Sequence, residues 1–166
     1  ERAEQNVPPL PLSADQTAEL IELLKTDHEE SELLMELLVQ RIPAGVDQAA
    51  YVKAGFLSDI TEGKTTSPYI DANYAVELLG TMLGGYNITP LIECLKNEKL
   101  AEVAVAALSN TLLIVDAFNE INELAKSNDY AKKVLENWSE GKWFTTKDKL
   151  KDEIKLTVFK VSGEIN

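Results

Sequence analysis

The chain has 166 residues and a mass of 18.4 kDa, a size that suits one domain, or one domain and a fragment of another, without a metal or disulfide staple. Apolar residues make up 45% of it and aromatic residues only 7%, a composition typical of an ordered aliphatic protein rather than a disordered or disulfide-rich one. Its formal net charge of −12 disfavours nonspecific binding to nucleic acid or to an anionic membrane, because such binding draws on lysine and arginine.

The negative charge is uneven along the chain. Residues 13–62 hold 3 basic and 11 acidic side chains, whereas residues 141–166 hold 6 basic and 4 acidic ones, so local RNA binding stays open as an alternative. The longest apolar runs are far shorter than the ~20 residues of a membrane span, and residues 1–10 lack the apolar core of a signal peptide. We therefore expect a cytoplasmic protein.

The first part of the chain predicts an extended segment followed by two helices. Residues 1–12 contain three prolines, which fix their own φ angles and keep the preceding residues out of the helical region. Ser13 and Gln16 form a capping-box pattern that starts a helix ending near Lys25. A second amphipathic helix is predicted over residues 29–40, with leucines on one face.

Two aspartates mark the next two helix starts. Asp47 can cap a helix that ends near Glu62, in which apolar residues recur at helical spacing. Residues 63–69 are rich in turn formers and predict a loop. Asp71 can then cap a fourth helix over residues 72–82.

A glycine pair separates this fourth helix from the fifth. Gly84 and Gly85 end the fourth helix. Either Asn87 or Thr89 caps the fifth, and Pro90 lies near its first position, where the missing amide hydrogen costs nothing.

The remaining residues predict a buried helix, two amphipathic helices and a change of character. Residues 100–111 are almost all small or aliphatic, which a helix tolerates only when neighbours cover it on several sides, so we expect a central helix. Amphipathic helices are predicted over residues 115–125 and 129–140. A short helical pattern over residues 146–154 precedes an alternating strand pattern at 156–161.

The helices are arranged as pairs. Residues 88–97 and 100–112 have the layout of a HEAT-type repeat, with proline near the start of the first helix and smaller residues in the second. The pairs at residues 13–40 and 46–83 are expected to stack in the same way, although no fixed period is detectable. The predicted fold is therefore all-α, a short α-solenoid of degenerate HEAT-like helix pairs.

The strand pattern decides the predicted domain boundaries. A lone strand leaves its backbone groups unpaired, so it pairs with another chain or belongs to a sheet outside this sequence, and we favour the second. The predicted organisation is an extended segment at residues 1–12, a HEAT-like helical domain at 13–154, and the start of a following domain at 155–166.

Residue types that carry chemistry are sparse. His28 has no second histidine or cysteine near it and is interpreted as part of a solvated loop. Cys94, the sole cysteine, lies on the apolar side of its predicted helix and is interpreted as a small buried hydrophobe. The acidic residues of the second helix are interpreted as a solvated face: Glu29, Glu30, Glu32 and Glu36. We expect no catalytic, cofactor-binding or metal-binding residue in this chain.

Two segments rise above this background as candidate interdomain contacts. Gly84, Gly85, Tyr86 and Asn87 combine an aromatic side chain, an amide and a predicted helix start, so free backbone amides could bind an anion or a neighbouring domain. The alternative is that they only shape the turn and cap the helix. The second segment combines aromatic and basic residues near the predicted boundary and is interpreted as packing against a following domain, with nucleic-acid stacking as the alternative. Its members are Trp138, Lys142, Trp143, Phe144 and Lys147.

Four stretches of the sequence together resemble one family. They are VDQAAYVKAGFL at 46–57, AVELLGTMLGGYNITPLIECL at 75–95, ALSNTLLIVDAFNEI at 107–121 and LTVFKVSGEIN at 156–166. They closely resemble the N-terminal region of the bacterial aconitate hydratase B family, over nearly the whole chain from about Pro9. The resemblance implies a HEAT-like helical domain followed by a swivelling domain.

The resemblance also implies an activity for the full-length protein. Members interconvert citrate and isocitrate through cis-aconitate in the tricarboxylic acid cycle, some also handling 2-methylisocitrate, with a [4Fe-4S] cluster held by three cysteines. Those ligands and the substrate-binding residues lie in later domains, so the fragment alone is expected to be inactive and to hold no cofactor. Its implied roles are packing on the other domains, lining a substrate channel, and self-association or protein contact. Members also bind mRNA when the cluster is lost, but the net charge of −12 disfavours this domain as the main RNA site. A free-standing HEAT-type scaffold and an RNA-binding regulator are the alternatives.

Overall fold

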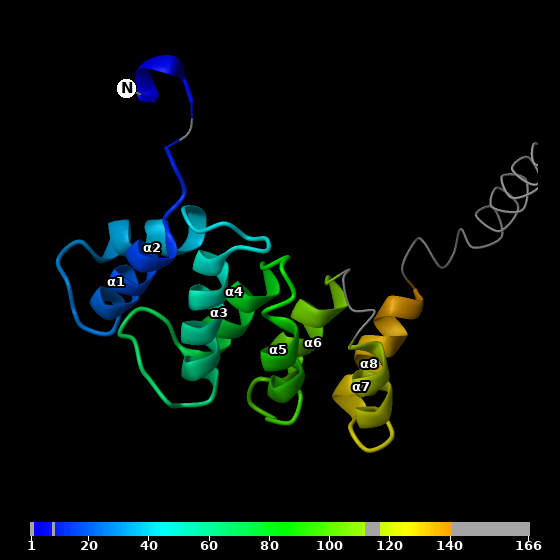
Figure 1. The fold of residues 1–166 in the computed structure, drawn as a ribbon. Helices are drawn as coiled ribbons and strands as arrows, with labels where there is room; N and C mark the ends of the chain where they lie inside the picture. Colours follow the sequence, from blue (N-terminus) through cyan, green and yellow to red (C-terminus); the bar gives the residue numbers. More distant parts are fainter. Residues whose placement is uncertain (1, 8, 112–116, 141–166) are drawn as a thin grey trace, which may run out of the picture.

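The computed structural model describes residues 2–7, 9–111 and 117–140, and this part of the chain is helical without a strand (Figure 1). The all-α solenoid-like architecture predicted from the sequence is confirmed for these residues. A 3₁₀ helix at Ala3–Gln5 precedes eight α-helices: α1 (Ala14–Leu24), α2 (Ser31–Gln40), α3 (Gln48–Thr61), α4 (Ala72–Gly80), α5 (Ile88–Cys94), α6 (Ala101–Ser109), α7 (Phe118–Leu124) and α8 (Asp129–Ser139). The predicted helix at 146–154 and strand at 156–161 lie outside the described residues.

The predicted start signals of three helices are confirmed. Ser13 and Gln16 form a complete capping box, in which the Gln16 amide donates to Ser13 Oγ at 3.2 Å and the Ser13 amide donates to Gln16 Oε1 at 3.0 Å. Asp47 accepts from the Ala49 amide, and Asp71 accepts from the Tyr74 amide, each at 2.8 Å. These bonds satisfy amides that have no partner within their own helix.

The N-terminal segment and α2 depart from their predictions. Residues 1–12 were predicted to be extended, but the described part contains the 3₁₀ turn at Ala3–Gln5. Helix α2 begins at Ser31, two residues later than the predicted start at Glu29, and Glu30 occupies the cap position in a non-helical conformation without a side-chain hydrogen bond. The Leu12 amide donates to the Arg41 carbonyl at 2.8 Å, which holds the entry segment against the end of α2.

Neighbouring helix pairs pack through their first helices at the start of the solenoid and through their second helices after that. The strongest contacts between neighbouring pairs join α1 to α3, then α4 to α6, then α6 to α8. Within pairs, α1 packs on α2, α3 on α4, α5 on α6, and α7 on α8. The second helices of the last three pairs therefore form a continuous row, with α6 in its middle.

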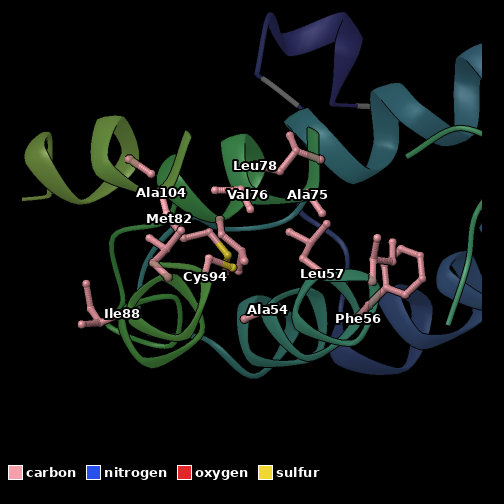
Figure 2. Packing of buried hydrophobic residues seen from close by; sticks show 14 of the residues in the cluster. Ala54, Phe56, Leu57, Ala75, Val76, Leu78, Met82, Ile88, Cys94 and Ala104 are labelled. Atoms are coloured by element: carbon pink, nitrogen blue, oxygen red, sulfur yellow. The ribbon is translucent and has the colours of Figure 1, made fainter. Parts of the chain in front are cut away.

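Helix α6 is the predicted central helix. It contacts α4, α5 and α8, and its buried residues include Ala104, Val105 and Leu108. Figure 2 shows Ala104 with buried side chains of α3 and α4 in the same apolar cluster. Small residues on α6 let these neighbours approach closely, which explains why this segment can be so uniformly apolar.

Helix α8 is tied to the preceding pair near both of its ends. The Asn128 side chain caps α8 by accepting from the Ala131 amide, and its Nδ2 donates to the Leu95 carbonyl at 2.9 Å. Near the other end, Trp138 Nε1 donates to the Leu108 carbonyl at 3.0 Å. The last described helix is therefore an integral part of the solenoid.

The even-numbered helices all end at the same edge of the molecule. In Figure 1 the α2–α3 connection, the α4–α5 connection and the ends of α6 and α8 lie along the upper edge, and the α3–α4, α5–α6 and α7–α8 connections lie along the lower edge. Loops that are far apart in the sequence thus become neighbours.

Candidate functional site

Two loops meet at the upper edge and form one surface. The Leu83 amide donates to the Ala44 carbonyl at 2.7 Å, which joins the α4–α5 connection to the α2–α3 connection. Tyr51 on α3 and Tyr86 pack edge to face, with ring centroids 5.3 Å apart at 77°. We call the surface formed by Val46, Tyr51, Leu83 and Tyr86 the loop surface.

The glycines of this region allow the loops to pack this closely. A Cβ atom on Gly84 would lie 2.8 Å from the Gly45 carbonyl carbon, so a side chain there would push the loops apart. Gly85 has a φ angle of +86°, a conformation that residues with a side chain rarely adopt. Gly80 lies against α6, where an added Cβ would come within 2.8 Å of Ala107 Cβ. These glycines therefore permit the close packing of α4 on α6 and of the α4–α5 loop on the α2–α3 loop.

Asn87 is buried, and its side chain does not cap α5 as the sequence predicted. It occupies the position before Ile88, but its Nδ2 donates back to the Leu79 carbonyl at 2.8 Å and to the Met82 carbonyl at 3.1 Å. Carbonyls at the end of α4 lack helical partners, so the amide satisfies them and fixes the turn into α5. Its Oδ1 has no hydrogen-bond partner among the residues that the structure describes.

The loop surface includes residues that the sequence analysis did not single out. Val46 is 82% exposed, Leu83 65% and Tyr51 59%, whereas Tyr86 is half-buried. The sequence contains one signal of this surface: residues 42–46 and 81–92 have no charged residue, in a chain that is 27% charged. What the sequence lacked was the adjacency of the two segments, which are about forty residues apart.

The second predicted contact segment is only partly described. Trp138 is half-buried and stacks on Phe118 with ring centroids 6.5 Å apart at 25°, so much of its surface is used within the solenoid. Trp143 and Phe144, with Lys142 and Lys147, lie outside the described residues. Their interdomain role stays a prediction.

Cys94 is enclosed by the hydrophobic core. Its thiol is buried among apolar side chains, and Figure 2 shows it in the same cluster as Val76 and Met82. Burial raises the pKa of the Cys94 thiol, which keeps it protonated and a poor nucleophile or metal ligand at neutral pH. The interpretation of Cys94 as a buried hydrophobe is confirmed.

The polar residues of the α1–α2 turn are exposed, as predicted. His28 lies at the surface, where its backbone amide donates to the Tyr69 hydroxyl, and it borders an open hollow between α1 and α2. The acidic residues Glu29, Glu30, Glu32 and Glu36 are all exposed. Among the described residues, no three His, Cys, Asp or Glu side chains come together as a group that could hold a metal ion. None of the helices described is long and apolar enough to span a bilayer.

The fold defines a helical-repeat domain, and the described residues place a mainly apolar loop surface at its upper edge. The family described as the aconitate B N-terminal domain matches residues 1–144. The chain belongs to this family, which confirms the resemblance drawn from the sequence.

Relatives that match this chain from end to end agree with this assignment. Aconitate hydratase B of Salmonella typhimurium is 53% identical over 168 residues, and that of Synechocystis sp. is 53% identical over 169 residues. Aconitate hydratase B of Helicobacter pylori is 42% identical over 168 residues. Each match covers 100% of this chain but only 19 to 20% of the relative. The chain thus spans about a fifth of the length of the curated relatives it matches.

Proposed function

We propose that this chain serves as the non-catalytic N-terminal domain of a cytoplasmic aconitate hydratase B. The full-length protein would interconvert citrate and isocitrate through cis-aconitate in the tricarboxylic acid cycle, as the names of the relatives support. The domain would pack against the remainder of the enzyme, with Gly84, Gly85, Tyr86 and Asn87 at the contact and Trp143 and Phe144 as a second contact. It would also contribute to the wall of the substrate channel.

One observation carries the non-catalytic assignment: the single cysteine of the chain is buried in the core. An iron–sulfur cluster of the kind that the family uses needs three cysteine thiolates, and this sequence contains only Cys94. Its thiol is buried in the hydrophobic core, and the sequence contains no second cysteine to supply a further thiolate. The residues of this chain therefore do not fit the cluster, whose ligands would come from the rest of the full-length enzyme.

The test uses Cys94→Ala in the full-length holoenzyme. We expect unchanged iron content, unchanged cluster absorbance and unchanged hydratase rates with citrate and isocitrate, because the side chain only fills space in the core. The protein is expected to lose only a small part of its unfolding free energy. Loss of iron and activity with an unchanged denaturation midpoint would show instead that Cys94 serves the cluster.

A further inference from the structure

The loop surface combines large exposed apolar groups with two segments that carry no charge, residues 42–46 and 81–92, next to the exposed carboxylate of Asp47. Val46, Tyr51 and Leu83 are among the most exposed large apolar side chains in the described residues, and all three lie on this one surface. Isolated apolar side chains at a surface are normal, but a contiguous group of them marks an interaction site. The cores of protein interfaces are depleted of charge and enriched in aromatic residues, as this surface is.

The loop surface is also preorganised by contacts within the domain. The hydrogen bond from Leu83 to Ala44 and the edge-to-face contact of Tyr51 with Tyr86 connect the two loops directly. Asn87 fixes the same turn from below through its bonds to Leu79 and Met82. A surface that is already ordered loses little conformational entropy on binding, which favours tight association.

The position of the surface indicates what covers it. The C-terminal end of α8 lies along the same edge of the solenoid as the two loops (Figure 1). Relatives of this chain are about five times as long. A polypeptide that continues from the end of α8 therefore emerges on the side of the molecule that carries the loop surface.

We propose that the loop surface binds the part of the enzyme that follows this domain in the same polypeptide. Val46 and Leu83 are the main apolar contacts of this interface. This inference rests on the proposed function and extends the contact from the glycine turn to the α2–α3 loop and to Tyr51. The matching face is expected to be mainly apolar, since Val46, Tyr51 and Leu83 are exposed apolar side chains and residues 42–46 and 81–92 carry no charge. The contact is within one chain, so it does not depend on protein concentration.

Hydroxyl-radical footprinting of the full-length holoenzyme tests the proposal. Protection factors are measured for Leu83 and Leu33 relative to the same peptides in the urea-unfolded chain. In the domain itself Leu83 is more exposed than Leu33, which is 49% exposed on α2. We expect Leu83 to be protected several-fold more than Leu33 in the holoenzyme, and the same protection factor after dilution.

Charge substitutions provide the matched control. Val46→Glu in the full-length enzyme is expected to restore the modification of Leu83 to the level of Leu33, whereas Leu33→Glu is expected to leave Leu83 protected. Both side chains are exposed in the domain, so neither change disturbs its core.

Two results would overturn the proposal. Equal or lower protection of Leu83 than of Leu33 in the holoenzyme means that nothing covers the loop surface. Protection that disappears on dilution means that a second copy covers it. Either result leaves the non-catalytic assignment intact, because that assignment is tested by the iron content and activity of Cys94→Ala.

Discussion

Lys53 Nζ on α3 donates a 2.8 Å hydrogen bond to the backbone carbonyl of Leu38, in the last turn of α2. The ammonium group is buried and replaces a partner that the helix itself cannot provide for this carbonyl. A cation at a helix C-terminus also interacts favourably with the helix dipole. The contact joins the first helix pair to the second just below the loop surface.

Burial makes the contribution of Lys53 to stability depend on pH. Desolvation lowers the pKa of Lys53 below its ordinary value of 10.5. Between the lowered pKa and 10.5 the unfolded chain binds more protons than the folded chain, so the unfolding free energy rises with pH. Relative to Lys53→Met, the wild type is expected to gain about 1.4 kcal/mol for each pH unit by which the pKa is lowered.

Urea unfolding of both proteins at pH 7 and at pH 10.5 measures this gain, because the upper value reaches the ordinary lysine pKa. Lys25→Met is the control, because Lys25 lies at the surface in an ion pair with Glu22. A difference between wild type and Lys53→Met that stays constant between the two pH values would show that Lys53 is not desolvated in the folded protein.

Gly80→Ala is expected to destabilise the domain by about 1–3 kcal/mol, since its Cβ would overlap Ala107 Cβ in a packed helix contact. The matched control is Gly55→Ala on α3, where an added Cβ meets nothing within 4 Å. That change is expected to stabilise α3 by roughly 0.5–1 kcal/mol. Chemical denaturation measures both, and effects of the same sign would contradict the close α4–α6 contact.

Asn87→Asp is expected to cost at least ~3 kcal/mol at pH 7, because it replaces a buried donor with a carboxylate facing two carbonyl oxygens. The exposed Asn97, whose Oδ1 accepts from the Lys99 amide, is the control, and Asn97→Asp is expected to change stability by less than ~0.5 kcal/mol. Denaturation midpoints that fall equally in the two variants would argue against the structural role of the Asn87 amide.

Leu108→Ala is expected to cost ~2–5 kcal/mol, as truncations of fully buried leucines do. Leu33→Ala, at a half-exposed site on α2, is expected to cost less than ~1 kcal/mol. The comparison is made by thermal and urea unfolding of the two variants. A loss below ~1 kcal/mol for Leu108→Ala would mean that α6 is not the centre of the core.

Local chemistry made much of the helical framework predictable. The capping box at Ser13 and the caps at Asp47 and Asp71 act within three residues, so the sequence carries them completely. The burial of Cys94 was equally readable, because apolar neighbours at helical spacing place it on the inner face of α5. The prediction that the Asn87 side chain caps α5 was wrong because it relied on residue type alone. The tertiary structure shows that the amide instead donates back to the Leu79 carbonyl of α4.

The sequence by itself determined the fold class, the family and the absence of the three cysteines that the cluster needs, because these follow from composition, periodicity and motifs. Only the tertiary structure brought Val46, Tyr51, Leu83 and Tyr86 onto one mainly apolar surface. The physical reason is that the surface depends on how successive helix pairs stack. That stacking places two distant loops side by side and is set by long-range packing rather than by local residue preferences.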